Sequence, residues 1–188
     1  MTKISKTPPI DNQTKLLCFD LEANGLHGQV FAVGAVVMDS TGKILDQFSG
    51  RCKLNEEIDE WVAQNILPAI KDMSATHGNP EALREAFWRW YLQAEPQSDY
   101  VLVNNGYPVE YRFLMQCQEA DLNERYWQHP FPILDLSSLL VQAHQDKKTI
   151  RKEILSKFSD QLGGSAHNPL YDAKLSALMA FSVLLPSE

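Results

Sequence analysis

The sequence predicts an α/β fold in which a mixed five-stranded sheet is flanked by helices. Residues 15–54 hold three strand-like segments joined by turn signals, which predicts an antiparallel meander. Beyond residue 99, short apolar segments alternate with helical patterns, which predicts parallel strands joined by helices. With 188 residues, 44% of them hydrophobic and 22% charged, the chain is long enough for one globular domain with a proper core.

Turn residues divide the antiparallel part into three strands. Asn24-Gly25 is a hairpin-type turn signal after the first strand, and residues 40–43 turn the chain after the second. The expected strands are residues 15–21, 29–39 and 44–54.

Helix signals dominate the next part of the chain. Residues 56–71 are helix-prone but interrupted by Pro68, so we expect one or two short helices there. Asn79 as the N-cap and Pro80 in the first helical position start a longer helix. Its apolar and aromatic side chains recur with the helical period, which predicts a core face and not a base-stacking platform. Trp88 lies off this face, which leaves an exposed position open for it.

Two further strands are expected, each followed by a helix. They are short and strongly apolar, and the glycines after residue 162 mark the end of a later helix. The expected strands are residues 100–103 and 132–136, and the expected helices begin near residues 108, 137, 150 and 168, the last running to about residue 185.

The chain is expected to be one domain with a loose end. Residues 1–14 are polar and carry two prolines, so we expect a flexible N-terminal arm, followed by a single domain over residues 15–188. No apolar run approaches the about 20 residues that span a bilayer, and the N-terminus lacks the apolar core of a signal peptide. Cys18, Cys52 and Cys117 are odd in number and widely spaced, as expected of small buried hydrophobes in a reducing compartment, so we expect a cytoplasmic location.

The charge of the chain bears on its partners. A net charge of −7 argues against a large basic groove for long duplex DNA and slightly favours short substrates. Acidic metal ligands contribute to that charge, so nucleic acid is not excluded.

Two carboxylates end the first strand. Side chains alternate along a strand, so Asp20 and Glu22 are expected to share one face near its C-terminal end. Two neighbouring negative charges repel, and a divalent cation with its preference for oxygen ligands removes that cost. The alternative for an isolated pair of this kind is a strand end that faces water.

Three more polar residues lie at helix starts. His167 comes just before the last helix, Asp172 lies about one turn inside it, and Glu110 lies in the first turn of an earlier helix. Each acid alone fits a residue that complements the helix dipole, and His167 alone fits a solvent-facing residue. Together with Asp20 and Glu22, they lie at the strand ends and helix starts where α/β folds build their sites. Four converging carboxylates would suit two divalent cations and phosphoryl transfer.

This pattern resembles the DEDDh branch of the DnaQ-like 3′–5′ exonucleases, which have the ribonuclease-H-like fold. The first family motif, D-x-E followed by a turn and Gly-Leu, corresponds to residues 20–26, and the last, His-x4-Asp followed by Ala, to residues 167–173. Residues 133–140 resemble the strand-to-helix piece between them, and His77-Gly78 resembles another recurring feature. The resemblance runs from about Lys15 to about Leu185, in the right order and spacing.

The second family motif departs from the pattern. It normally has Asp, followed after two residues by Phe-Leu. Here Phe113-Leu114 aligns and places Glu110 where the Asp is expected. The preceding Asn is displaced by one position, so Asn104 or Asn105 could take its positioning role. In the first motif, Ala23 replaces the usual Thr.

The resemblance implies a two-metal exonuclease that releases nucleoside 5′-monophosphates from single-stranded DNA or RNA 3′ ends. Asp20 would bridge two Mg²⁺ or Mn²⁺ ions, Glu22 and Asp172 would hold one of them, Glu110 would support the other, and His167 would be the general base. The turn after Glu22 borders the expected site, so by position alone Asn24, Gly25, Leu26 and His27 are expected to contact the terminal nucleotide, and Asn105 is expected to help position the nucleic acid.

Two alternatives remain open. The altered second motif, Ala23 and the lack of a basic patch suit a catalytically weak or inactive binding module for nucleic acid or protein. The related branch that uses Tyr instead of His is disfavoured, because Tyr171 directly precedes Asp172 and so has the wrong offset. The family includes both free-standing enzymes and subunits, and a homo-oligomer is possible.

Overall fold

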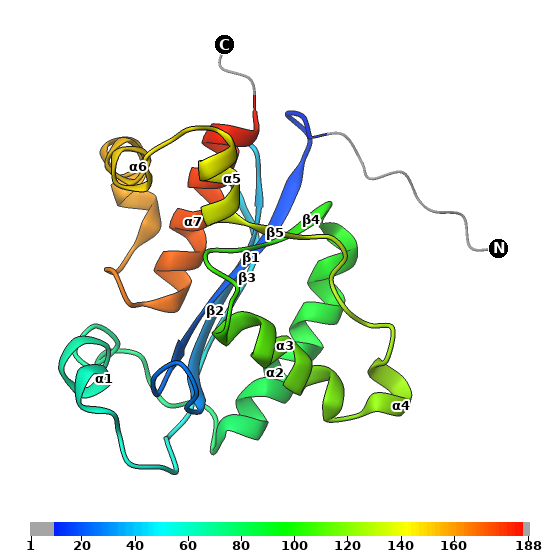
Figure 1. The fold of residues 1–188 in the computed structure, drawn as a ribbon, viewed down its shortest axis with the longest axis vertical. Helices are drawn as coiled ribbons and strands as arrows, with labels where there is room; N and C mark the ends of the chain where they lie inside the picture. The colour runs from blue at the N-terminus through cyan, green and yellow to red at the C-terminus, as the bar shows by residue number, and fades with distance from the viewer. Residues whose placement is uncertain (1–9, 186–188) are drawn as a thin grey trace.

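The structure is a computed structural model that describes residues 10–185. A five-stranded sheet runs through its centre in the order β3-β2-β1-β4-β5 (Figure 1). β1 pairs antiparallel with β2, and β2 with β3, whereas β1, β4 and β5 run parallel. The strands are β1 (Lys15–Ala23), β2 (Val30–Asp39), β3 (Ile44–Arg51), β4 (Tyr100–Val103) and β5 (Ile133–Asp135). The predicted mixed sheet with three antiparallel strands followed by parallel strands is therefore confirmed.

Helices cover both faces of the sheet (Figure 1). One layer holds α2 (Pro80–Ala94), α3 (Val109–Glu119) and the short α4 (Leu122–Arg125), and the other holds α5 (Leu136–Gln142), α6 (Lys147–Leu162) and α7 (Pro169–Leu184). The remaining elements are α1 (Glu60–Asn65), which lies between β3 and α2, and the 3-10 helix η1 (Glu95–Gln97), which lies between α2 and β4.

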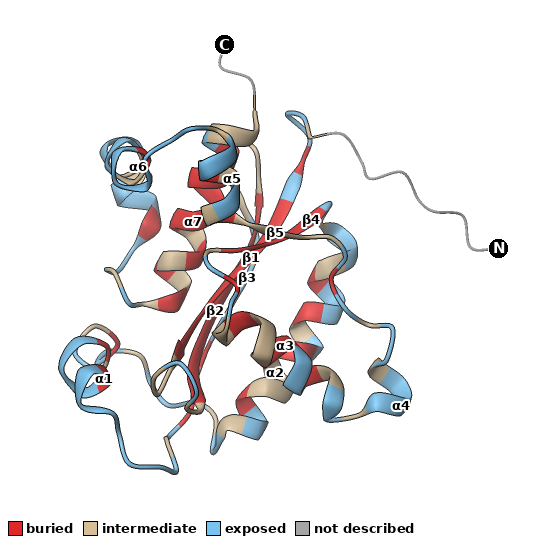
Figure 2. Cartoon of the chain, viewed as in Figure 1, coloured by how far each residue is buried: buried red, intermediate tan, exposed pale blue. Residues whose placement is uncertain are grey.

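The alternation of side chains along β1 divides the interior into two cores. Leu17 and Phe19 belong to a core with α2 and α3, whereas Leu16 and Cys18 belong to a core with α5, α6 and α7. All four side chains are fully buried, because helices cover both faces of this strand. Figure 2 shows most of β1, β2 and β4 buried, with exposed positions along the outer faces of α1, α4 and α6.

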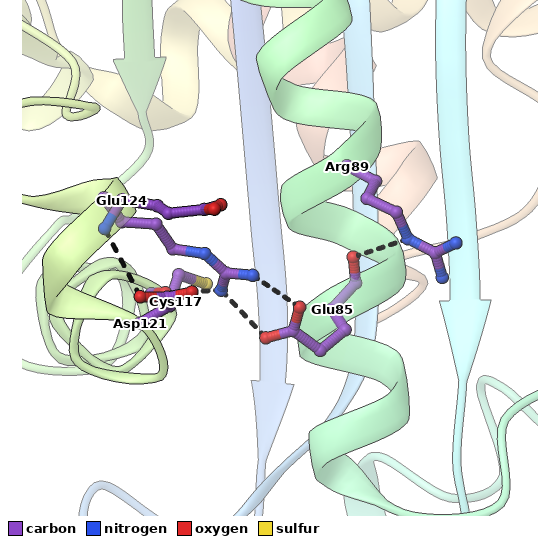
Figure 3. Close-up of polar contacts among 6 residues, drawn as sticks. Glu85, Arg89, Cys117, Asp121 and Glu124 are labelled. Atoms are coloured by element: carbon purple, nitrogen blue, oxygen red, sulfur yellow. Dashed lines mark hydrogen bonds and ion pairs between the residues drawn. The ribbon is translucent and has the colours of Figure 1, made fainter.

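The structure shows that Trp88, for which the sequence left an exposed position open, is buried. It is 1% exposed and stacks on Tyr91 with ring centroids 4.9 Å apart. The guanidinium carbon of Arg125, the last residue of α4, lies 5.9 Å from the centroid of the Trp88 ring. The same guanidinium donates two hydrogen bonds to the Glu85 carboxylate and one to the Cys117 carbonyl (Figure 3). α2 is thus covered on a second side by α3 and α4, which the single apolar face of its sequence does not reveal.

Other boundaries shift slightly from the predictions. β3 ends at Arg51 and not at residue 54, because Cys52 leaves the ladder and forms an isolated parallel bridge with His77. Of the expected arm, residues 1–9 lie outside the described residues. Within its remaining part, the Asp11 N–H donates to Thr14 Oγ1 at 2.8 Å. The three cysteines are free and buried, as predicted. Within residues 10–185, no helix has the length and hydropathy that crossing a membrane requires.

Candidate active site

β1 places two acids against the start of α7. Leu16 and Cys18 face the core that α7 shares, so the same alternation turns Asp20 and Glu22 toward α7. Both side chains are 8% exposed. On the neighbouring strand Gly34 stands directly opposite Asp20.

Gly34 allows α7 to begin close to the sheet. A Cβ at this position would lie 2.0 Å from the Leu170 nitrogen and 2.2 Å from the Pro169 carbonyl carbon. The start of α7 is fixed further by the N-cap Asn168, whose Oδ1 accepts hydrogen bonds from Leu170 and Tyr171. Asp172, in the first turn, is thereby brought over the end of β1.

Three carboxylates converge at this point. One oxygen each of Asp20, Glu22 and Asp172 lies within 4.8 Å of the other two. His167 adjoins them with a left-handed backbone at φ 66°, which lets its N–H donate to Asp172 Oδ2 at 2.7 Å. Its Nδ1 lies 3.9 Å from Glu22 Oε1.

Glu110 approaches from the opposite core. It lies in the first turn of α3, is 7% exposed, and its negative charge raises the pKa of Asp20 and Glu22. Its carboxylate is not part of the three-membered group whose oxygens lie within 4.8 Å of one another. The structure therefore brings four acids to one region and three of them into mutual contact range.

The electrostatics of these acids favour a cation. Burial, and then the neighbouring carboxylates, raises the pKa of Asp20 well above its usual range and that of Glu22 to about 8. Burial raises the pKa of Glu110 to about 7. Within residues 10–185, no protein group donates a hydrogen bond to the side-chain carboxylate of Asp20 or Glu22. Buried carboxylates without donors are the ligand set that a hard divalent cation needs, so the residues present fit such an ion.

The turn after β1 is held from two sides. The Asn24 side chain donates to Glu56 Oε1 and the Glu57 carbonyl, and it accepts from the Asp59 N–H. Arg112 donates to the carbonyls of Leu26 and Gly28. The amide of Asn24 is thus occupied by protein partners, whereas the side chains of Leu26 and His27 are exposed, Leu26 at 62%.

The predicted residue Asn105 lies apart from the three-carboxylate group. It is exposed and lines a groove of about 730 Å³ with Tyr107, Tyr111 and Asp135. Asn104 is held by protein partners: its Oδ1 accepts from Lys147 Nζ at 2.8 Å, and its carbonyl accepts from the Ser137 hydroxyl.

Sequence reasoning missed Trp61. Its ring meets that of His167 edge to face, with centroids 6.0 Å apart, and 57% of the residue is exposed. The α1 segment also holds the polar residues Glu60 and Gln64, so a large aromatic residue on a short helix beside them was the available signal. Trp61, beside His167, and Leu26, on the turn that follows Glu22, both leave apolar surface exposed.

Solved structures that superpose on this chain include exonucleases. The nuclease domain of 3′hExo, a DEDDh family member bound to rAMP, superposes with a TM-score of 0.60 at 17% identity, covering 92% of both chains. A 3′-exonuclease that recognises the 3′ end of a histone mRNA stem-loop gives a TM-score of 0.60 at 13% identity, covering 92% of this chain and 82% of that one. E. coli exonuclease I with single-stranded DNA gives 0.56 at 17% identity, covering 92% of this chain and 40% of that one.

The fold is that of DEDDh exonuclease domains. The ribonuclease-H-like architecture predicted from the sequence is thereby confirmed. No protein-family model matches the chain, and a comparison with curated proteins gives no match. At these identities the likeness establishes the fold, and the chemistry has to be argued from the site itself.

Proposed function

We propose that this protein is a metal-dependent 3′–5′ exonuclease that releases nucleoside 5′-monophosphates from single-stranded DNA or RNA ends. The observation that carries the proposal is the convergence of Asp20, Glu22 and Asp172, with His167 hydrogen-bonded to Asp172 at its edge. The structural neighbours bind rAMP, stem-loop RNA and single-stranded DNA, which supports nucleic acid as the partner.

In this proposal, the acids hold two Mg²⁺ or Mn²⁺ ions. Asp20, Glu22 and Asp172 are the ligands, and Glu110 supports the second ion from α3. When bound, such ions lower the pKa of a coordinated water and stabilise the charge that develops on the phosphate oxygens.

The free, buried cysteines suit a reducing compartment such as the cytoplasm.

His167 acts as the general base. Its N–H bond to Asp172 fixes the backbone, and 46% of its side chain is exposed, so a water on the phosphate side can reach it. The imidazole takes the proton of the attacking water as the water oxygen bonds to phosphorus. The bond from phosphorus to the O3′ of the preceding nucleotide breaks, and the leaving O3′ takes a proton from a solvent water.

Leu26 and Trp61 provide apolar surface for the terminal base and sugar. Both are exposed next to the acids, and both segments are held together by the Asn24 side chain. His27 lies on the same turn. Gly25 has a positive φ of 78°, a conformation that glycine adopts without strain, and this shapes the turn. Asn24 serves this surface by holding the turn, and Asn105 contacts the strand farther along.

Digestion of 5′-labelled single-stranded DNA and RNA tests the proposal. With Mg²⁺ or Mn²⁺ we expect a ladder that shortens from the 3′ end and is absent for His167→Ala. A 3′-phosphorylated strand is the matched control, because it distinguishes an exonuclease that needs a free 3′ end from an endonuclease. A folded protein that cleaves neither nucleic acid with either metal would overturn the proposal.

A binding module without catalysis is the second candidate. It is favoured by one observation, that Glu110 stands outside the three-carboxylate group, where its longer side chain replaces the family's Asp. Calorimetry with Mn²⁺ separates the candidates, since the module would bind no metal at this site. Glu110→Asp then shows whether the extra methylene limits turnover: a gain in rate would identify the altered second motif as the cause.

A further inference from the structure

A strongly basic segment stands out on this acidic chain. Residues 147–152, the first half of α6, hold four of the 17 Lys and Arg residues, although the net charge of the protein is −7. The sequence-based expectation that the chain lacks a basic patch overlooked this segment. We call it the α6 basic segment; its cations are Lys147, Lys148, Arg151 and Lys152.

These cations are not neutralised by acidic partners. Among residues 10–185, none of the four forms a salt bridge. The nearby Asp146 is used as the N-cap of α6, where it accepts hydrogen bonds from the Thr149 backbone and hydroxyl. Lys148 and Lys152 are exposed and lie one turn apart on one side of the helix.

The α6 basic segment begins at the candidate active site. Lys147 donates to Asn104 Oδ1, at the end of β4. Asn104 directly follows Val103, which pairs with Phe19, the residue before Asp20. The residues that follow Lys147 along the helix therefore extend a positive surface outward from the acids.

We infer that the single strand entering the active site runs along the first half of α6, where Lys148, Arg151 and Lys152 bind its backbone phosphates. This inference rests on the proposed function and extends it to nucleotides beyond the one being removed. Residues four apart on a helix rise by about 6 Å, which is comparable with the spacing of phosphates in an extended strand. Ammonium and guanidinium groups recognise phosphates without reading bases, so the contact tolerates any sequence.

The inference predicts a dependence on substrate length. A dinucleotide ends before it reaches Lys148 and Lys152, whereas a long oligonucleotide contacts both. For single strands the slope of log K against log salt changes by about 0.7 for each phosphate contact. Losing two contacts should therefore reduce the slope by about 1.4 and weaken binding about 25-fold at about 0.1 M salt.

Anisotropy of labelled strands tests this in a His167→Ala background, which prevents cleavage in the presence of Mg²⁺. The test variant is Lys148→Gln/Lys152→Gln, and the control is Lys157→Gln on the same helix. Its neighbour Phe158 lies against the turn at Gly42, at the opposite end of the sheet from the acids. We expect the double variant to lose affinity and salt slope for the long oligonucleotide, to keep its affinity for the dinucleotide, and to differ from the control.

Several outcomes would overturn the inference. They are an unchanged salt slope in the double variant, an equal loss in Lys157→Gln, an equal loss for the dinucleotide, or no binding of the long oligonucleotide at all. Failure of the exonuclease proposal is distinguishable from these. In that case the unmutated protein would bind the long strand through Lys148 and Lys152 but leave it intact.

Discussion

Arg112 holds the turn that carries Leu26. Its guanidinium donates to the Leu26 carbonyl at 2.9 Å and to the Gly28 carbonyl at 2.8 Å, although the turn lies more than 80 residues earlier in the chain. Arg112 is two residues from Glu110 on α3, so one helix start both supplies an acid and fixes the apolar surface beside the acids. This makes Arg112 a positioning residue of the proposed site.

Arg112→Met is expected to release the turn and leave the acids in place. The fork of the guanidinium makes two hydrogen bonds that Met cannot replace, each worth about 1 kcal/mol or more. The KM for an oligonucleotide should therefore rise about tenfold, with kcat changed much less. Steady-state kinetics with the variant check this.

Arg89→Met is the matched control, because Arg89 is exposed on α2 and its hydrogen bond stays within that helix. Equal KM values for Arg112→Met and the unmutated protein would show that the turn needs no such support. A loss confined to kcat would assign Arg112 a different role.

Gly34→Ala is expected to damage fold and site together. The new Cβ would meet backbone atoms of Pro169 and Leu170 at 2.0–2.4 Å, and backbone cannot move aside without displacing α7. Overpacking of this kind costs about 1–3 kcal/mol or more, which corresponds to a fall in melting temperature of several degrees. Because Asp172 moves with α7, Mn²⁺ affinity measured by calorimetry should fall as well.

Gly78→Ala controls for the loss of a glycine, since a Cβ there has no neighbour within 4 Å. Its melting temperature should stay close to that of the unmutated protein. A stable Gly34→Ala with normal metal affinity would mean that α7 can move away from β2 without disturbing Asp172.

The same contact shows what the sequence can and cannot predict. Alternation along β1 was enough to place Asp20 and Glu22 on one face, and the Asn168-Pro169 start was enough to locate the beginning of α7. That Gly34 allows α7 to pack closely on the sheet beside these acids follows only from the structure. The presence of a glycine in a strand does not indicate which segment packs against it. The hydrogen bonds of Arg112 and the burial of Trp88 could not be predicted from the sequence for the same reason, because both depend on segments that are distant in the chain.

Stability without metal should depend on pH in an unusual direction. The pKa of Glu22 is about 8 and that of Glu110 about 7 in the folded protein, against about 4.5 for an exposed glutamate. Between these values the folded protein keeps protons that the unfolded chain has released. The free energy of unfolding therefore falls as pH rises from about 5 to about 8, by up to about 1.4 kcal/mol per pH unit for each group.

Thermal unfolding with a chelator at pH 5.5 and pH 8 measures this effect. We expect a lower melting temperature at pH 8, a gain there on adding Mn²⁺, and little gain at pH 5.5, where protons compete with the cation. Glu22→Gln should flatten the dependence, because it removes the group with the higher pKa. A melting temperature that rises between the two pH values would contradict the assignment of these acids as buried and unpaired.

Trp61→Ala is expected to weaken binding of the released nucleotide. The indole stands edge to face with His167 and presents more than half of its surface to solvent, so a base can stack on it without rearrangement. Base–aromatic stacking is worth about 1–3 kcal/mol, or a loss of about 5- to 150-fold in affinity for a nucleoside 5′-monophosphate. Trp61→Phe should recover most of that loss.

Trp127→Ala is the control, because Trp127 is 81% exposed but contacts Tyr126 just after α4, in the layer on the other face of the sheet from α7. Product inhibition constants for the three variants decide the matter: if Trp61→Ala and Trp127→Ala are inhibited alike, the terminal base does not lie against Trp61.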